Sequence, residues 1–218
     1  WYDAGEVNKT IEVLTDAVGD LGYAFVDIRP RVERDRDNLT IDIVYDIQEG
    51  PKVFVERIDV EGNTRTLDRV IRREFQIVEG DAFNTSKLRR SRQRVQNLGF
   101  FKSVTVENEQ GSAPDRTVVK VAVEEQPTGD VTFGAGFSSA DGPIGNIGLR
   151  ERNLLGRGQD LRLGFTLAGE ATELDFSFTE PYFLDRNLAA GIDLYRVTTD
   201  REDESSYEEE RIGGSLRG

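Results

Sequence analysis

The sequence contains no cysteine, histidine or methionine among its 218 residues. Without cysteine there is no disulfide framework and no thiol chemistry. Without histidine there is no Ser-His-Asp triad and no imidazole metal site. No Walker motif or GxGxxG fingerprint occurs, since Gly134-Ala135-Gly136 lies in a strand-like pattern and leads into no helix. The sequence therefore gives no positive indication of an enzyme, a nucleotide cofactor or a metal.

Long apolar runs are also lacking. No stretch approaches the roughly 18 apolar residues that a spanning helix requires, so any membrane segment has to be a barrel strand of about 9–11 alternating residues. The net charge of −13 argues against nucleic acid as the main partner, because phosphate binding requires a basic face. With no signal peptide and no initiating methionine, we expect a piece of a longer, processed precursor.

Residues 1–50 predict one helix and two strands. Apolar residues at steps of four and three between residues 5 and 21 are typical of one helix face, and Gly22 ends it. Residues 23–32 alternate as a strand, and Pro30, which lacks an N–H group, places that strand at a sheet edge. Residues 39–47 alternate again.

Residues 51–126 predict the order β-α-α-β-β. A first strand is followed by a helix that Thr66 can cap and that contains Phe75. Asn84 can cap a second helix, which Gly99 ends. Strands at residues 100–107 and 117–125 complete a three-stranded sheet with two helices.

The two regions repeat one another. Leu21-Gly22-Tyr23 matches Leu98-Gly99-Phe100 at an offset of 77 residues, and residues 47–51 match 123–127 at 76. A period of this size is typical of tandem small domains. Because the first copy lacks its leading strand and helix, we expect the chain to start inside a domain.

These residues resemble the POTRA domains of the BamA family of outer-membrane assembly proteins. Besides the element order and the internal copy, the resemblance rests on four motifs, Glu61-Gly62-Asn63, Arg72-Arg73-Glu74, Glu79-Gly80 and Asn97-Leu98-Gly99-Phe100-Phe101. It implies that residues 1–50 are the C-terminal part of one POTRA domain and that residues 51–126 are the complete last domain before a barrel.

From Thr128 onward the pattern changes to period two. One face of the first strand is apolar, with Val131, Phe133, Ala135 and Phe137. The same alternation recurs at residues 144–152, 161–167, 174–178 and 188–195, and a sixth strand starts at residue 211. A barrel wall in lipid requires such alternation. Residues 127–218 therefore predict about six antiparallel strands of an incomplete transmembrane β-barrel.

Two turns, at residues 151–158 and 179–183, resemble the periplasmic turns at the start of the BamA barrel, so the resemblance covers the whole chain. It implies assembly and insertion of outer-membrane proteins without covalent chemistry. The implied location is the Gram-negative outer membrane, with the POTRA domains and the turns at 154–158 and 181–187 in the periplasm. The implied partners are accessory lipoproteins of the assembly complex, unfolded outer-membrane protein clients and outer-membrane lipids.

The first barrel strand is one candidate site. The resemblance makes it one side of a lateral seam where a client strand pairs by β-augmentation. The seam residues are Val131, Thr132, Phe133, Gly134, Ala135, Gly136 and Phe137. Glycine weakens a strand edge and eases its opening. Alternatively, the glycines relieve crowding on the lumen side, and the two interpretations are compatible.

A basic surface on the two helices is the second candidate. It comprises Arg65, Arg69, Arg72, Arg73, Lys87, Arg89, Arg90, Arg92 and Arg94. Such a run is usually a solvated face, and the alternatives are docking to an acidic partner or to anionic lipid head groups. The resemblance implies that an accessory lipoprotein binds through Arg72, Arg73, Glu74 and Glu79.

The outer strands at residues 23–32 and 100–107 are the third candidate, because a strand edge accepts an unfolded peptide through backbone hydrogen bonds. The residues expected to do so are Phe101, Lys102, Ser103, Val104 and Thr105. Pro30, Asp27 and Lys102 are of the kinds that blunt an edge against pairing, which leaves both interpretations open.

An acidic tract between Asp200 and Glu210 carries seven carboxylates that could hold a divalent cation. It lacks EF-hand spacing and favours a solvated external loop. For the chain as a whole, two alternative functions remain. One is a translocation-assembly subunit or two-partner secretion transporter of the same superfamily. The other is a passive adhesion or cell-wall-binding module, against which the periodic strands argue.

Overall fold

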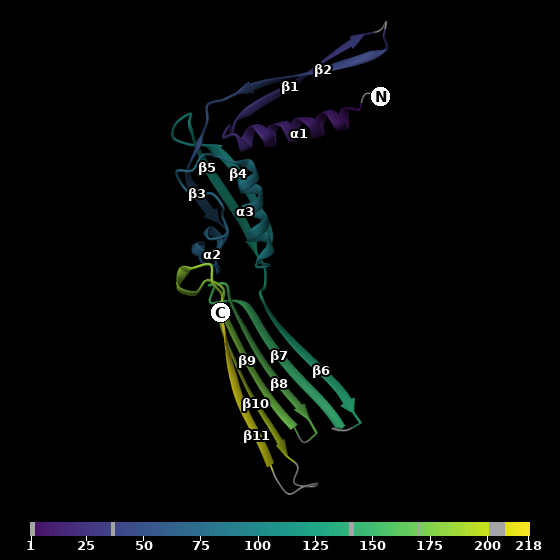
Figure 1. Ribbon diagram of the computed structural model, residues 1–218, viewed down its shortest axis with the longest axis vertical. Coiled ribbons are helices and arrows are strands. Elements are labelled where there is room, and N and C mark those ends of the chain that lie inside the picture. Colours follow the sequence, from purple (N-terminus) through teal and green to yellow (C-terminus); the bar gives the residue numbers. More distant parts are fainter. Residues whose placement is uncertain (1–2, 36–37, 140–141, 170, 201–207) are drawn as a thin grey trace. The chain divides into compact units, whose positions relative to one another are not determined.

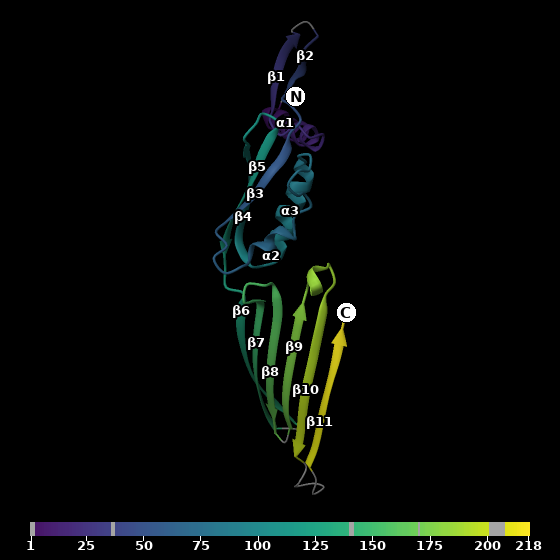
Figure 2. The same cartoon turned by 90° about the vertical axis from the view of Figure 1, so that its left-hand side faces the viewer.

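The computed structural model describes residues 3–35, 38–139, 142–169, 171–200 and 208–218 (Figures 1 and 2). Its contacts divide the chain into two compact units. The first takes in the residues up to Asn63 together with Ile71–Glu125, and the second joins Thr64–Val70 to Gln126–Gly218. Among the described residues, no helix combines the length and apolarity needed to cross a bilayer.

The first 50 residues form a helix and a hairpin, α1 (Ala4–Asp20), β1 (Val26–Asp35) and β2 (Thr40–Glu49). The Asp3 carboxylate accepts a hydrogen bond from the Gly5 N–H group at 2.7 Å and so caps the helix. The apolar stripe buries Val7 and Val18. The predicted helix and the predicted second strand are confirmed.

Strand β1 starts at Val26, later than predicted. The N–H groups of Gly22 and Tyr23 donate to the carbonyl oxygens of Gly19 and Val18 at 3.1 and 3.4 Å, so the chain is not yet extended there. Among the described residues β1 pairs with β2 alone. The described part of residues 1–50 thus contains a two-stranded sheet, in line with the two strands predicted for it.

The middle of the chain has the predicted β-α-α-β-β order, as β3 (Phe54–Glu61), α2 (Asp68–Arg72), α3 (Thr85–Asn97), β4 (Phe101–Gln110) and β5 (Arg116–Glu125). Strand β5 lies between β3, to which it is parallel, and β4, to which it is antiparallel. The core is made by Ile71, Ile77, Val95, Val119 and Val121, all fully buried. Each such side chain contributes about 1.5–3 kcal/mol on burial.

Helix α2 is shorter than predicted. The N–H groups of Glu74 and Phe75 donate to Ile71 and Arg72 at 3.1 and 3.0 Å, three residues back, and these bonds close the helix. Beyond the end of the helix, Phe75 and Ile77 are buried in the core. Helix α3 agrees with the prediction, because the Asn84 side chain accepts a hydrogen bond from the Lys87 N–H group at 2.7 Å.

The C-terminal part contains six strands, β6 (Gly129–Ser138), β7 (Gly142–Leu154), β8 (Gln159–Ala168), β9 (Ala171–Glu180), β10 (Ala190–Asp200) and β11 (Glu208–Arg217). Each pairs antiparallel with the next in sequence order, and Figure 2 shows them as one layer. Strands β6 and β11 are the outer members of this layer. The prediction of about six antiparallel strands is confirmed.

The register of these strands lines up apolar side chains into rows. Val131 lies opposite Leu149, Leu149 opposite Leu163, and Leu163 opposite Phe176. These side chains remain 37–54% exposed, as expected for a face that meets lipid.

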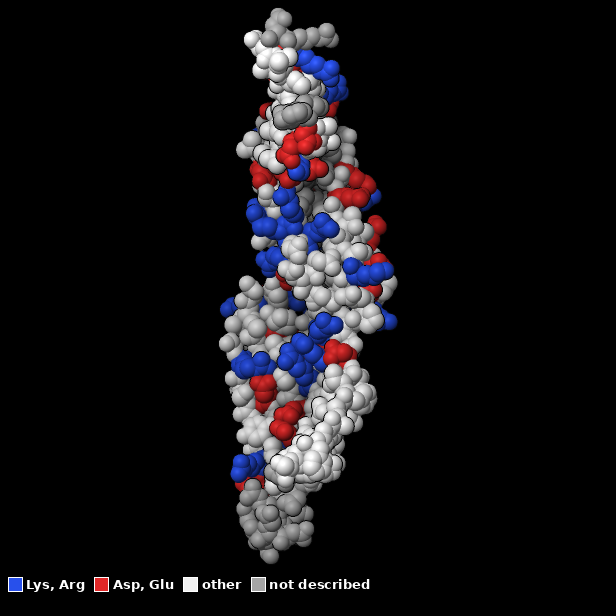
Figure 3. Space-filling model, turned by 90° about the vertical axis from the view of Figure 1, so that its right-hand side faces the viewer, with Lys and Arg blue, Asp and Glu red and all other residues white. Residues whose placement is uncertain are grey.

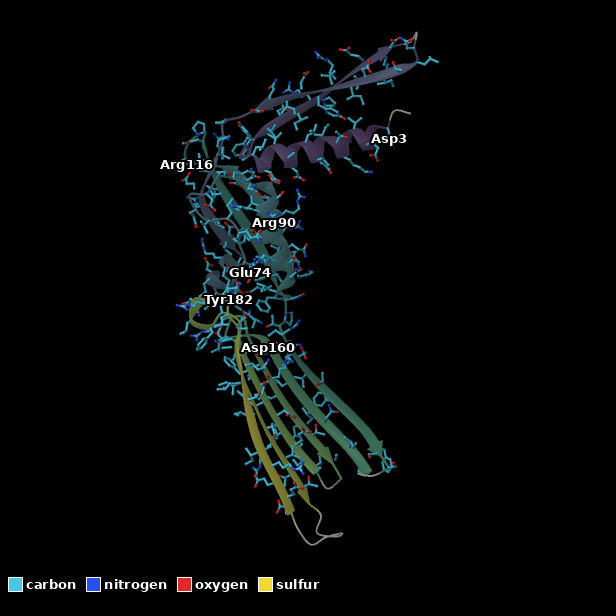
Figure 4. The ribbon with its side chains drawn as sticks, in the orientation of Figure 1. Asp3, Glu74, Arg90, Arg116, Asp160 and Tyr182 are labelled. Atoms are coloured by element: carbon cyan, nitrogen blue, oxygen red, sulfur yellow. The ribbon has the colours of Figure 1, made fainter. Side chains whose placement is uncertain are left out.

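The other face of the strands is polar or small. There Thr132 lies opposite Gly148, and Asp160 binds Arg150 and Arg162 at 2.7 and 2.9 Å. Asp160 is labelled in Figure 4. The alternation predicted from the sequence is thus confirmed on both faces.

One feature of this part was not predicted, a short 3₁₀ turn, η1 (Phe183–Asp185), between β9 and β10. Leu184 and Asp185 both have left-handed φ angles, 55° and 56°. Most of the acidic tract, residues 201–207, lies outside the described residues.

Candidate functional site

Strand β6 is an outer strand of its sheet and carries the predicted seam residues Val131, Thr132, Phe133, Gly134, Ala135, Gly136 and Phe137. Its outward face is highly exposed, with Phe133 at 76% and Phe137 at 80%. A largely uncharged ridge runs down the lower part of the molecule in Figure 3, where this strand lies. The strand thus presents apolar side chains beside an edge to which no described strand is paired.

The two central glycines of β6 have different surroundings. A Cβ atom at Gly134 would overlap the side-chain amide of Asn146 on β7, so this glycine makes room for its neighbour. A Cβ atom at Gly136 would meet nothing within 4 Å. Relief of crowding therefore accounts for Gly134 but not for Gly136, where the absence of a side chain only loosens the edge.

Arg72 and Glu79 form an exposed pair beside β3. The Arg72 guanidinium donates to the Glu79 carboxylate at 2.7 Å and to the Ile58 carbonyl oxygen at 2.5 Å. The two side chains are 39% and 44% exposed. A hydrogen bond from its own backbone N–H group, together with Arg72, holds the pKa of Glu79 below its ordinary value of 4.5, against the opposing effect of burial.

Arg73 and Glu74 lie deeper. Their side chains are only 16% and 9% exposed, and Glu74 binds Arg94 of α3 at 3.0 Å. Figure 4 labels Glu74 within the domain. Glu74 therefore ties the α2 region to α3, and of the four predicted partner-binding residues Arg72 and Glu79 are the more accessible.

The basic side chains of α3 are largely used within the protein. Figure 3 shows Lys and Arg gathered on the face that carries this helix. Arg89 pairs with Asp16 of α1, and Arg90, labelled in Figure 4, donates to Gln76 at 3.0 Å. The prediction of a solvated or partner-binding run did not foresee these internal bonds, because their acceptors lie far away in the sequence.

The edge strand β4 is partly covered by α3. Arg92 donates to the Val104 carbonyl oxygen at 2.9 Å, and Gln96 donates to the Phe101 carbonyl oxygen at 3.1 Å. Phe101 and Val104 point into the core, whereas Lys102 binds Glu124 at 3.0 Å. β4 is thus an outer strand as predicted, but the backbone acceptors of Phe101 and Val104 are already occupied.

A hydrogen-bonded contact between the turn after β7 and the segment Thr64–Val70 was not foreseen. The buried Asn153 side chain donates to the Thr66 hydroxyl at 2.9 Å and accepts from the Gly158 N–H group at 2.7 Å. The Leu67 N–H group donates to the Gly156 carbonyl oxygen at 2.9 Å. This contact explains why the segment Thr64–Val70 belongs to the same compact unit as strands β6–β11.

Gly156 is required for this contact. Its φ angle is 70°, and a Cβ atom there would overlap the carbonyl oxygen of Arg65. The sequence signal was present, since asparagine followed by two glycines at a spacing of two is typical of a tight turn. The partner of that turn is 87 positions away from Asn153 and left no local signal.

The chain matches two known sequence families. The model of the POTRA family, described as surface antigen variable number repeat, matches residues 1–50 and 53–126, more than half of the chain. The model of the Omp85 superfamily domain matches residues 153–217.

Three similar proteins agree with these matches. The outer membrane protein assembly factor BamA of Nitratidesulfovibrio vulgaris is 36% identical over 99% of this chain and 27% of its own length. BamA of Neisseria meningitidis is 29% identical over 100% of this chain and 28% of its own. The crystal structure of BamA from Haemophilus ducreyi lacking POTRA domains 1–3 is 26% identical, with a TM-score of 0.85, over 99% of this chain and 41% of that one.

The chain therefore spans less than a third of the curated relatives it matches. The predicted fold class, POTRA-type α+β domains followed by antiparallel strands of an unclosed barrel, is confirmed by the family match and by the superposition.

We predict that Asn153→Ala weakens the contact with Thr64–Val70. The substitution removes a buried side-chain amide that donates one hydrogen bond and accepts another. Its loss lowers the stability of the contact by about 1–3 kcal/mol. Hydrogen exchange at the Leu67 amide should speed up accordingly. Leu155→Ala, at a 76% exposed position of the same turn, is the control and should leave this amide unchanged. Equal effects of both substitutions would contradict the role of Asn153.

We predict that the Arg72–Glu79 ion pair makes the local stability of the fold around β3 depend on pH. Because the folded-state pKa of Glu79 is lowered, its contribution is complete above pH 4.5 and is lost as the pH falls through the lowered value. The Ile58 N–H group donates to the Glu79 carboxylate at 3.4 Å, so exchange protection of this amide, corrected for intrinsic rate, should fall in acid in the wild type and much less in Glu79→Gln. Glu107→Gln, an exposed carboxylate on β4, should behave as the wild type, and an unchanged acid dependence in Glu79→Gln would refute the assignment.

Proposed function

The chain belongs to the BamA family, with POTRA domains followed by Omp85-type strands, and on that premise we propose that it assembles and inserts outer-membrane proteins. Its relatives are named outer membrane protein assembly factors. The proposed work is non-enzymatic and takes place in the Gram-negative outer membrane, with the POTRA domains in the periplasm.

We assign a role to each part of the chain. Residues 1–50 and 51–126 are the end of one POTRA domain and the whole of the last one, and they receive accessory lipoproteins and unfolded clients. Residues 127–218 are the first strands of the barrel. Support comes from the family match over the first two parts and from the two-faced sheet in the third.

The observation that carries the proposal is the character of β6. The strand is an outer member of its sheet, is apolar on one face, and has at Gly136 a position where neither its own side chain nor a neighbour fills the space. An incoming client strand can add to such an edge through backbone hydrogen bonds. Strand β6 thereby serves as the template for the first client strand.

The POTRA surfaces have narrower roles than the sequence suggested. Of the charged residues, Arg72 and Glu79 are the ones proposed to meet an accessory lipoprotein, since Arg73 and Glu74 are engaged within the domain. On β4, client pairing at Phe101–Thr105 has to displace Arg92 from the Val104 carbonyl oxygen. We therefore place augmentation on the part of β4 beyond Val104.

The proposal predicts that cysteines on β6 of the full-length protein form disulfides with a cysteine in a stalled client strand. Thr132→Cys and Gly136→Cys are the positions of choice, because a side chain at Gly134 would collide with Asn146. Crosslinked product on gels, identified by mass spectrometry, is the measurement.

Thr166→Cys is the matched control. Thr166 lies on the same face as these positions, but in β8, which is paired on both sides. Crosslinks are expected from β6 and not from β8. No crosslink anywhere from Val131 to Phe137, or equal crosslinking from Thr166→Cys, would argue against templating by β6.

A further inference from the structure

A pocket of about 600 Å³ lies at the end of strands β8–β11 where the η1 turn is found. Its lining combines apolar and basic side chains, among them Arg69, Arg157, Phe178, Phe183, Ile192 and Leu216. Nothing in the proposed pairing of client strands uses it. All of these residues belong to the unit formed by the strands and Thr64–Val70.

The floor of the pocket belongs to the apolar face of the sheet. Phe178 lies opposite Leu161 and Ile192, and Ile192 lies opposite Leu216, so these residues form one row across four strands. Ile192 and Leu216 are 43% and 82% exposed. The row is the last apolar one before the turns.

The next row along the same face is polar. Glu180 lies opposite Ala190 and accepts a hydrogen bond from the Gln159 side chain at 2.7 Å. On a barrel wall, a change from apolar to polar residues marks the boundary between hydrocarbon and head groups. The pocket therefore lies at the level of lipid head groups.

The turn beside the pocket is folded back and held in place. The Phe183 N–H group donates to the Leu188 carbonyl oxygen at 2.8 Å, and the Tyr182 N–H group donates to Glu180 at 3.0 Å. Tyr182 is labelled in Figure 4. Phe183 and Leu184 stay 43% and 76% exposed. An aromatic-rich turn at this level is typical of residues that settle among head groups.

Two arginines at the pocket have no partner among the described residues. Arg69 and Arg157 are exposed and make no ion pair there, whereas Arg217 is held by Asp193 at 2.6 Å. On the acidic side, Glu180 is occupied by hydrogen bonds, and Asp185 is the one unpaired carboxylate of the described lining. The hydrogen bonds to Glu180 come from neutral donors and leave its charge in place, so the described lining offers two guanidinium groups without an ion-pair partner beside an apolar floor.

We propose that this pocket binds an anionic phospholipid of the periplasmic leaflet, such as phosphatidylglycerol. The phosphate lies between Arg69 and Arg157, whose planar guanidinium groups suit phosphate oxygens, and an acyl chain covers Phe178, Ile192 and Leu216. The inference rests on the proposed function, because it requires the strands to stand in a membrane.

The test uses the full-length protein with Phe183→Trp, reconstituted in nanodiscs of phosphatidylcholine containing a minor share of phosphatidylglycerol. Either lipid carries brominated acyl chains, which quench nearby tryptophan fluorescence. The measured quantity is the quenching added by Phe183→Trp over the same protein without it. Brominated phosphatidylglycerol should quench far more than its share of the lipid predicts.

Substitution separates a site from general surface charge. Arg69→Gln and Arg157→Gln should each lower the preference for phosphatidylglycerol about fivefold. Arg186→Gln removes the same charge from the same turn, at an exposed arginine outside the pocket, and should leave the preference unchanged.

Three results would overturn the inference. Equal quenching by both lipids, or a loss in Arg186→Gln as large as in Arg69→Gln, refutes the site and leaves the proposed function intact. Absence of quenching by either lipid shows that the turn does not reach a membrane, and this result overturns the proposed function as well.

Discussion

The register between neighbouring strands is the constraint on which the C-terminal half depends. In lipid every backbone N–H and C=O group has to be bonded within the sheet, so each strand is fixed to the next by its ladder. A slip by one residue would turn every side chain to the opposite face. In the observed register, Val131 pairs with Leu149, Leu149 pairs with Leu163, and Leu163 pairs with Phe176. The apolar side chains therefore form unbroken rows across the strands. The outer strand β6 is fixed on one side only, and its proposed role as a template follows from the same ladder.

Much of this architecture could be predicted because its signals are local. Period-two alternation identified the six strands, and a capping residue such as Asn84 marked the start of α3. The shortened α2 was missed for a physical reason. The apolar periodicity of the helix continues through Phe75, whereas the three-residue hydrogen bonds of the Glu74 and Phe75 N–H groups end the helix before it. The η1 turn was missed because left-handed Leu184 and Asp185 carry no glycine to announce it.

The candidate sites could be predicted in part. The sequence located a basic run on α3, but it could not show that Arg92 caps an edge carbonyl or that Arg94 is bound to Glu74. Such bonds depend on which residues meet after folding. Asn153 and Thr66 are a second case, because their bond joins a turn to a segment 87 positions away. The charged and polar side chains that can form hydrogen bonds are known from the sequence. How many of them remain available to a partner protein depends on the tertiary fold.

Two kinds of surface thus have different proposed roles in outer-membrane protein assembly. Backbone edges receive strands of any sequence, because their hydrogen bonds make little demand on side chains. Charged and aromatic side chains around Arg72, and around the pocket beside η1, are proposed to recognise partners or lipid by chemistry. The proposed roles of the β6 edge and of the pocket both require that the apolar face of the strands stands in a bilayer.

Lipid exposure along β8 tests that dependence most directly. Spin labels placed singly at residues 161–167 of the full-length protein in membranes report contact with oxygen dissolved in the lipid. If the apolar face meets lipid, accessibility has maxima at Leu161, Leu163, Phe165 and Leu167 and minima at the residues between them. Uniform accessibility, or maxima on the alternate residues, would contradict it.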